Sequence, residues 1–118
     1  MKVIICGDRN YSDYKAIKEF LKNSDVTCVV QGEAPGADSL AKKAALELGI
    51  EVLSYPANWS ALGKKAGPIR NAQMLSENPD VRQVIAFHDD FNASKGTKHM
   101  INHAAAKGYD TRVVEKKK

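Results

Sequence analysis

Short runs of β-branched and other apolar residues alternate along this chain with longer stretches in which apolar positions recur at helical spacing. The first run is Val-Ile-Ile-Cys at 3–6, and in the following stretch Ile17, Phe20 and Leu21 share one side of a helix. Repetition of this pattern predicts strands at 3–6, 26–30, 50–54, 84–87 and 111–114, and helices at 13–22, 38–48, 69–77 and 98–107.

This order of elements predicts an α/β fold. We expect a single Rossmann-like domain over residues 1–118, with a mainly parallel five-stranded sheet and helices on both faces. The longest irregular stretch is 55–68, and loops of that length in compact domains are usually functional. Ligands of open α/β sheets bind beyond the carboxyl ends of the strands, so we expect the functional residues in the loops at that edge.

Composition places few further limits. The 118 residues are 43% hydrophobic and 27% charged, which is ordinary for one globular domain. No apolar run reaches membrane-spanning length, and the first residues enter a strand without a cleavage site, so we expect a cytoplasmic protein with no membrane partner. The net charge of +4 owes much to the terminal Lys116–Lys118 run and is compatible with nucleic acid and with small phosphate-bearing ligands alike.

Neither the cysteines nor the histidines indicate a metal site. Cys6 and Cys28 fall in predicted buried strands, where reduced thiols are favoured over a disulfide, and their spacing matches no metal template. His99 and His103 are spaced to share a helix face, but no third ligand is evident. We therefore predict no metal and no cofactor.

The first candidate loop follows the first strand. Gly7 lets the backbone approach a ligand closely, Asp8 follows it, and Arg9 can offer a planar fork to a phosphate or carboxylate. An ordinary turn with a solvent-facing arginine is the alternative.

The second candidate loop joins the second strand to its helix. Gly32 and Gly36, followed by Ala37 at a helix start, predict a cradle of backbone amides that favours an anion. Asp38 caps the helix in one interpretation and accepts hydrogen bonds from a ribose in the other. The spacing matches neither of the common dinucleotide and phosphate motifs.

The third candidate loop follows the fourth strand and opens a helix. Ser94, Gly96 and Thr97 supply hydroxyl and amide groups suited to phosphate, and Lys95 adds a positive charge. Asp89 lies at the start of the same loop. Simple helix capping is the alternative.

The 55–68 stretch and the helix after it carry the remaining candidates. Trp59, the only tryptophan, could stack on a base or anchor the loop on the core. Arg70 and Asn71 lie near the start of the helix, and Lys64 could reach a phosphate or simply be solvated.

Together these segments resemble the SLOG superfamily, the Rossmann-like fold of the DprA and LOG proteins, and in particular its short YspA-like branch. The matching segments, in the expected order over nearly the whole chain, are Gly7-Asp8-Arg9, Gly32-x-x-x-Gly36-Ala37-Asp38, Gly67-Pro68-x-Arg70-Asn71-x-x-Met74 and Lys95-Gly96-Thr97. The resemblance implies a sheet edge that binds nucleotide-derived molecules. It also implies a homo-oligomer, since relatives often pair.

Members of the superfamily divide into phosphoribohydrolases, which cleave the N-glycosidic bond of nucleoside monophosphates, and ligand binders or sensors. The hydrolases carry P-G-G-x-G-T-x-x-E and an arginine from the preceding helix. Arg70 matches that arginine, but Met100 stands where the glutamate should be. Glycosidic cleavage needs a carboxylate, which Asp89 or Asp90 would have to supply. This departure favours binding over catalysis, and no catalytic residue is predicted.

The sequence therefore predicts non-catalytic binding, for sensing or sequestration, of a nucleotide-derived small molecule such as an ADP-ribose-like or cyclic nucleotide signal. One alternative is a phosphoribohydrolase with a displaced acid. Another is a binder of single-stranded DNA like DprA, supported by the positive charge and Trp59. A closed pocket would favour the small ligand, and an open basic groove with aromatic residues would favour the strand.

Overall fold

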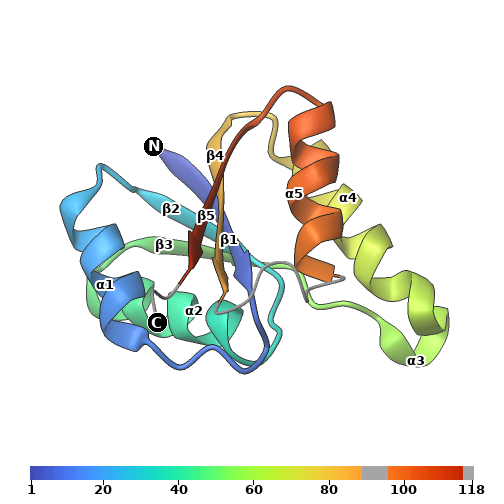
Figure 1. Cartoon of the computed structure of the whole chain (residues 1–118), viewed down its shortest axis with the longest axis horizontal. Helices are drawn as coiled ribbons and strands as arrows, with labels where there is room; N and C mark the ends of the chain where they lie inside the picture. Colours follow the sequence, from blue (N-terminus) through green and yellow to red (C-terminus); the bar gives the residue numbers. More distant parts are fainter. Residues whose placement is uncertain (89–95, 116–118) are drawn as a thin grey trace.

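Five parallel strands form one sheet in the middle of the molecule, between two layers of helices (Figure 1). The computed structural model describes residues 1–88 and 96–115. The strands are β1 (Lys2–Gly7), β2 (Cys28–Gln31), β3 (Glu51–Ser54), β4 (Val81–His88) and β5 (Asp110–Glu115), in the spatial order β3-β2-β1-β4-β5. The helices are α1 (Tyr14–Asn23), α2 (Ala37–Glu47), α3 (Trp59–Leu62), the 3-10 turn η1 (Gly63–Lys65), α4 (Ala66–Glu77) and α5 (Gly96–Ala106). The predicted α/β fold with a parallel five-stranded sheet is confirmed.

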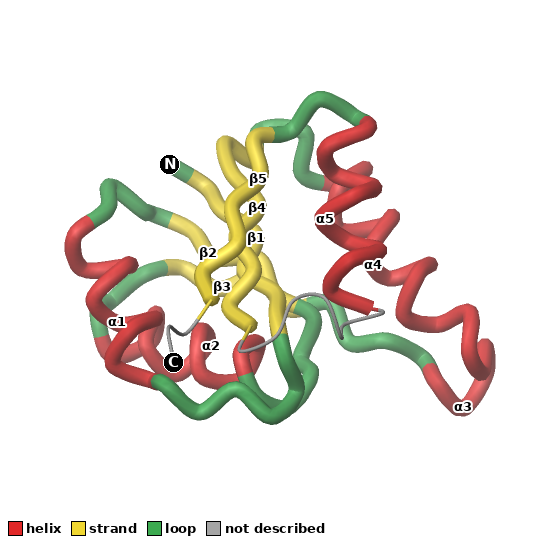
Figure 2. The backbone as a smooth tube through the Cα atoms, viewed as in Figure 1, coloured by secondary structure: helices red, strands yellow, loops and turns green. Residues whose placement is uncertain are grey.

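Alternating side chains of the central strands build a separate core on each face of the sheet. Val3 and Ile5 of β1 pack with α1 and α2, whereas Ile4, between them, packs with α4 and α5. All three are fully buried. Figure 2 shows the two helical layers on opposite sides of the strands. Because both faces are covered, the middle of each central strand is apolar on both sides, which is why the strands appear in the sequence as short apolar runs.

The chain reverses its direction of travel across the sheet between β1 and β4. It first moves outward from β1 through β2 to β3, then returns to the other side of β1 to add β4 and β5. The amide of Asp8 donates to the carbonyl of Phe87 (3.0 Å), so the ends of β1 and β4 remain close where their loops part. This edge is where ligands of open α/β sheets bind.

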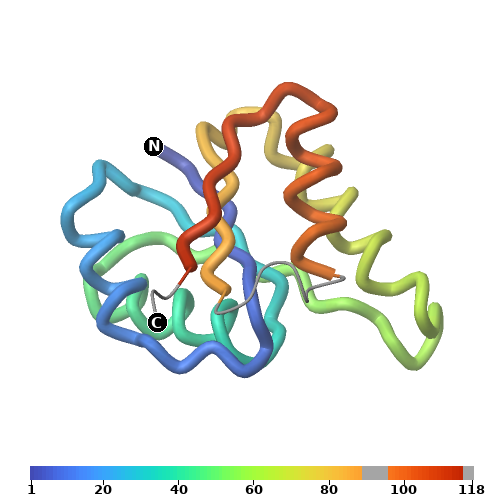
Figure 3. The backbone as a smooth tube through the Cα atoms, viewed as in Figure 1, coloured from blue at the N-terminus to red at the C-terminus, as the bar shows by residue number. Residues whose placement is uncertain are grey.

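The expectation of an irregular segment over 55–68 is wrong in part. Asn58 caps α3 by accepting a hydrogen bond from the amide of Ala61 (3.2 Å), and α4 begins at Ala66 instead of at residue 69. Pro68 is compatible with this start because amides in the first helical turn have no intrahelical partner. Figure 3 shows this part of the chain, in yellow-green, projecting away from the sheet.

Other element boundaries differ less. β4 begins at Val81, three residues before the predicted apolar run, because pairing with β1 and β5 depends on the backbone and tolerates the polar Arg82 and Gln83. α1 begins one residue later than predicted, because Asp13 caps it by accepting a hydrogen bond from the amide of Ala16 (3.2 Å). None of the described helices combines the length and the apolar character needed to cross a membrane.

Candidate functional site

A cleft of about 1040 Å³ opens at the carboxyl ends of β1, β2 and β4. Its walls are the loop after β1, the loop after β2, the α3–α4 segment and the first turn of α5. The cleft therefore lies at the edge of the sheet where the topology predicts ligand binding.

Ten of the predicted site residues meet in this cleft. They are Gly7, Asp8, Arg9, Gly32, Asp38, Trp59, Arg70, Asn71, Gly96 and Thr97. Gly36, Ala37 and Lys64 do not line it. Asp89, Ser94 and Lys95 lie outside the described residues, so their roles stay predictions.

The start of α2 closes against the loop after β1. Gly36 has a φ of +76°, and a side chain there would overlap the backbone of Asp8 and Arg9. The amide of Ala37 donates to the carbonyl of Asp8 (3.1 Å). Gly36 and Ala37 thus hold two loops of the site together, and a ligand contact is not needed to explain them.

The amides of the loop after β2 are used by the protein itself. One carboxylate oxygen of Asp38, Oδ2, accepts from the amides of Gly32 (3.2 Å) and Ala34 (3.3 Å). The amide of Glu33 donates to Oε1 of Gln31 (2.5 Å). These three amides therefore donate to side chains of the protein, and the binding of an anion by the remaining amides at the start of α2 stays a prediction.

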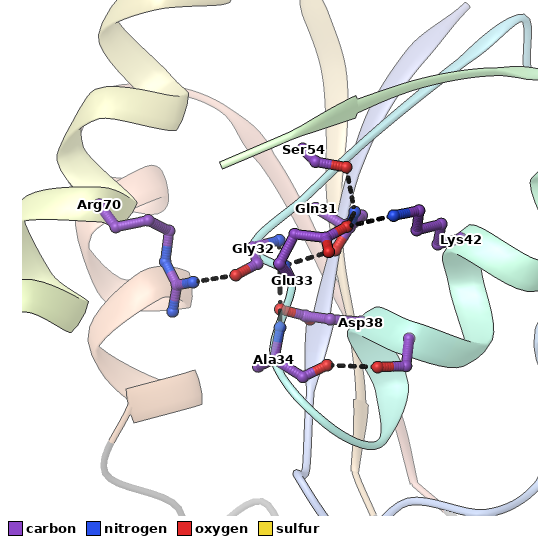
Figure 4. A network of polar contacts seen from close by, with 9 residues as sticks. Gln31, Gly32, Glu33, Ala34, Asp38, Lys42, Ser54 and Arg70 are labelled. Atoms are coloured by element: carbon purple, nitrogen blue, oxygen red, sulfur yellow. Dashed lines mark hydrogen bonds and ion pairs between the residues drawn. The ribbon is translucent and has the colours of Figure 1, made fainter. Parts of the chain in front are cut away.

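A polar network at the end of β2 fixes this arrangement (Figure 4). Nε2 of the fully buried Gln31 donates to the carboxylate of Glu33 (2.6 Å) and to Oγ of Ser54 (2.7 Å), and Lys42 pairs with Glu33 at 2.9 Å. Hydrogen bonding to Gln31, then to Lys42 and Ser54, lowers the pKa of Glu33 to about 2. Glu33 also has a φ of +57°, uncommon for a residue with a side chain, and the network stabilises that turn.

Asp38 brings a carboxyl group into the interior of the site. It is 6% exposed, and burial raises its pKa to about 6. The hydrogen bond from the Ala34 amide, the positive charge of Arg70 and the Gly32 amide act in the opposite direction. Asp38 is consequently ionised for the most part at pH 7 and becomes protonated in mild acid.

Arg70 projects from α4 to the loop after β2 (Figure 4). Its Nη1 donates to the carbonyls of Gly32 (2.5 Å) and Tyr55 (3.4 Å), and its Nε donates to Oδ1 of Asn71 (3.0 Å). A side chain on Gly32 would overlap the guanidinium, so this approach requires glycine. Nη2 has no acceptor in the described part of the chain, which leaves one nitrogen of the fork able to bind an anion.

Trp59 stands at the outer wall of the cleft. It is 58% exposed, and a methyl group on Gly67 would lie 3.2 Å from its ring. The ring thus rests against the backbone of α4, where the absence of a side chain makes room for it. An exposed indole held this way offers a face to a planar ligand.

Two histidines that the site prediction left out also line the cleft. His88, 7% exposed, ends β4 with its Nε2 at 4.0 Å from Oδ2 of Asp8. His99 lies on α5 with its Nδ1 at 3.4 Å from Nδ2 of Asn71, and its ring stacks on that of His103. Their signal in the sequence is position alone: His88 ends a central strand, and His99 falls in the first turn of the helix that follows.

Neither cysteine is prepared to act as a nucleophile. Both are free thiols, and burial raises the pKa of Cys6 far above its usual range and that of Cys28 to about 11. Within residues 1–88 and 96–115, no three His, Cys, Asp or Glu side chains gather where they could hold a metal ion.

The fold and the cleft define a doubly wound α/β protein with a cleft at its topological switch point. The chain belongs to the YspA, cpYpsA-related SLOG family, whose sequence profile matches residues 1–61. It is also similar to the Gene 61 protein of Mycobacterium phage D29, at 32% identity over 91% of this chain and 90% of that protein.

Among solved structures, DNA processing protein A (DprA) from Streptococcus pneumoniae shares the fold. It superposes with a TM-score of 0.81 over 98% of this chain, at 20% identity. This chain spans half the length of that DprA chain. The likeness confirms the Rossmann-like architecture that the sequence predicts.

Proposed function

We propose that the protein binds a nucleotide-derived small molecule in this cleft and holds it unchanged, as a sensor or a sequestering protein does. The observation that carries the proposal is the meeting of Trp59, Arg70 and Asp38 in one cleft of about 1040 Å³. An indole can stack on a base, a guanidinium can bind a phosphate, and a carboxylate can accept from hydroxyl groups. The volume is close to that of pockets that enclose cofactors and drug-sized ligands.

The charge of the cleft favours a small ligand over a nucleic-acid strand. Among the described residues, its lining carries three carboxylates, of Asp8, Glu33 and Asp38, against the two guanidinium groups of Arg9 and Arg70. No lysine is among them. Proteins that bind strands obtain most of their affinity from lysines and arginines that neutralise successive phosphates. Among the described residues, the positive charge of the chain is thus not concentrated in this cleft.

Single-stranded DNA remains the second candidate ligand. Trp59 is exposed, and Lys64 and Lys65 follow it in η1, outside the cleft. An aromatic face beside cations is the combination that strand-binding proteins use. The shared fold with a protein named for DNA processing adds support.

The lining of the cleft supports binding over hydrolysis. Met100, which replaces the glutamate of the resembling hydrolases, is 1% exposed and lies in the cleft wall. A thioether can neither activate water nor stabilise a developing positive charge on a sugar carbon as a carboxylate does. This position of the cleft therefore lacks the group that the hydrolytic reaction requires.

The single tryptophan provides the test. Titration with AMP, GMP, cyclic nucleotides and ADP-ribose should quench Trp59 fluorescence for at least one of them, and calorimetry should give one ligand per chain. The same titration with oligo-dT at about 50 and 200 mM salt measures strand binding, whose affinity should fall steeply with salt.

Lys64→Ala combined with Lys65→Ala is the matched control, because both side chains lie outside the cleft. It should leave small-molecule affinity unchanged and weaken any strand binding. Salt-sensitive binding of oligo-dT with no response to any nucleotide would overturn the proposed function in favour of the second candidate.

A further inference from the structure

Only one of the two carboxylate oxygens of Asp38 accepts hydrogen bonds from the described part of the protein. Its Oδ2 accepts the two amide hydrogen bonds from Gly32 and Ala34. Its Oδ1 accepts no hydrogen bond from the described part of the chain; the residue is 94% buried, but this oxygen is not itself fully enclosed and so is open to the cleft that Asp38 lines. An ionised oxygen in such a place gains from a hydrogen-bond donor that arrives with a ligand.

The charged groups around Asp38 do not supply that donor. Arg70 of α4 acts on Asp38 through its charge, but the two form no ion pair, because its Nη1 and Nε donate to carbonyl and amide oxygens instead. Glu33, in the loop after β2, and Cys6, of β1, are acids themselves. The Asp8 carboxylate and the His88 imidazole line the same cleft, with Oδ2 of Asp8 and Nε2 of His88 4.0 Å apart.

From this geometry we infer that Oδ1 of Asp38 accepts a hydrogen bond from a ribose hydroxyl of the ligand, so that the cleft selects ribonucleotides over deoxyribonucleotides. The inference rests on the proposed function and makes it specific. Asp38 is thereby assigned as the residue that determines sugar specificity, and the sugar lies beside the loop after β2.

A hydroxyl group fits this position better than the other parts of a nucleotide. A phosphate offers only acceptor oxygens and would be repelled by the carboxylate, and a ring nitrogen that accepts would be rejected as well. An exocyclic amino group of the base is the remaining donor, and it can be separated from the sugar by experiment. A site built to bond a hydroxyl rejects the analogue that lacks it, because the bound analogue shields the acceptor from water and leaves it unpaired.

The test compares sugar and base analogues on the unaltered protein. For the ribonucleotide of the panel that binds most tightly, calorimetry is repeated with its 2′-deoxy and 3′-deoxy forms and with an analogue that lacks the exocyclic amino group, IMP in the case of AMP. We expect one or both deoxy forms to bind about 10- to 100-fold more weakly, the range for a hydrogen bond to a charged group. The amino-deficient analogue should bind about as well as its parent.

Asp38→Asn should reduce the difference between ribose and deoxyribose to less than about threefold, since it removes the charge that strengthens the hydrogen bond. Ser39→Ala is the matched control. Its hydroxyl donates to the carbonyl of Ala34 (2.7 Å) on the exposed side of the same loop, so the control should retain the full discrimination.

The outcomes separate the two proposals. Equal affinity for ribo and deoxy forms, or loss of binding only with the amino-deficient analogue, would overturn the role of Asp38 and leave the proposed function standing. If no ribonucleotide of the panel binds, the proposed function itself fails. The analogue comparison does not depend on whether Asp38→Asn folds.

Discussion

Two arginines that look equivalent in the sequence have different surroundings in the folded chain. Arg9 is exposed, with no hydrogen bond or ion pair to the described residues, whereas Arg70 links α4 to the loop after β2. Arg9→Ala should therefore weaken nucleotide binding by about 1.5–3 kcal/mol and change the free energy of unfolding by less than about 0.5 kcal/mol. Arg70→Ala should weaken binding similarly and also lower the free energy of unfolding, by about 1–3 kcal/mol, since the carbonyl of Gly32 loses its donor.

Calorimetry and urea denaturation of both variants check this pair of expectations. Arg70→Lys gives an intermediate case, because an ammonium group keeps the charge but cannot span the same acceptors as the planar fork. An Arg70→Ala protein as stable as the parent would show that the observed hydrogen bonds contribute nothing to the fold. Unchanged affinity in both alanine variants would remove the phosphate-binding role from these arginines.

Glu33 and Asp38 should give the stability of the protein opposite responses to pH. Glu33 has a pKa lowered to about 2, so the stability it contributes is present above about pH 4.5 and is lost as the pH falls toward 2. Asp38 has a pKa raised from 3.8 to about 6, so the native state holds its proton more tightly than the unfolded chain. Its contribution is complete below about pH 4 and is lost as the pH rises through 6.

Urea denaturation between pH 3 and pH 8 tests these signs. In Asp38→Asn the decline of stability between about pH 4 and 6 should be reduced, and in Glu33→Gln the decline below about pH 4.5 should be reduced. Ser76→Ala, which removes an exposed hydroxyl on α4 that donates to the backbone carbonyl of Gln73 (3.3 Å), serves as a control that leaves both slopes in place. A steeper decline between pH 4 and 6 in Asp38→Asn would contradict the assignment.

At the scale of elements, helices and strands could be predicted from the sequence where the local order of apolar and polar residues determines them. The buried runs of β1 and β2 and the capped start of α1 follow from apolar period and side-chain capping. The α3–η1 segment was missed because its helical turns bury none of their own residues and so leave no apolar period to detect. The ring of Trp59, its first residue, rests against the backbone at Gly67, eight residues further along the chain. A contact over that separation leaves no pattern in the local sequence.

A side chain added at two glycines of the candidate loops should have different effects: at Gly36 it should lower stability, and at Gly96 it should lower ligand affinity. Gly36→Val places a branched side chain at a φ of +76° against the backbone of Asp8 and Arg9, so we expect unfolding to become easier by about 1–3 kcal/mol or more. A side chain on Gly96 meets no described atom within 4 Å, and Gly96 lines the cleft. Gly96→Val should therefore keep its stability and lose ligand affinity.

Thermal melts followed by circular dichroism, combined with the fluorescence titration, distinguish these cases. Gly49→Val is a further control for φ alone, because that glycine has a φ of +72° with no neighbour within 4 Å and lies outside the cleft. If Gly96→Val binds its ligand with parental affinity, the first turn of α5 does not contact the ligand. If Gly36→Val is no less stable than Gly49→Val, the contact between the two loops is unimportant.

At the scale of the whole molecule, topology determined how much of the site could be predicted. Parallel strands bring their carboxyl ends to one edge, so four loops distant in sequence were expected to meet there, and ten candidate residues line one cleft. The hydrogen-bond partners of those residues could not be predicted. The amides of Gly32 and Ala34, which were expected to bind an anion, donate to Asp38 instead, and Arg70 donates to the carbonyl of Gly32. Neither contact could be predicted, because each joins segments that meet only in the folded chain. The expected homo-oligomer stays a prediction, which native mass spectrometry would test.

Whether the whole molecule is a binder or an enzyme is decided by the fate of its ligand. The position of the hydrolases' glutamate is filled by a buried methionine, so bound nucleotide should be recovered intact after prolonged incubation and denaturation. General acid–base help is typically worth about 10²–10⁴ in rate, and hydrolysis without it should be negligible over hours. The carboxylates of Asp8 and Asp38 line the cleft, and Asp89 or Asp90 is the acid that the sequence predicts, so these four are the candidates to replace the missing glutamate. Liquid chromatography that detects free base at ordinary enzyme turnover, abolished by Asp89→Asn, Asp90→Asn, Asp8→Asn or Asp38→Asn, would overturn the binding function, and the variant that abolishes it would identify that acid. Intact recovery of one nucleotide per chain would instead support a protein that binds its ligand and leaves it chemically unchanged.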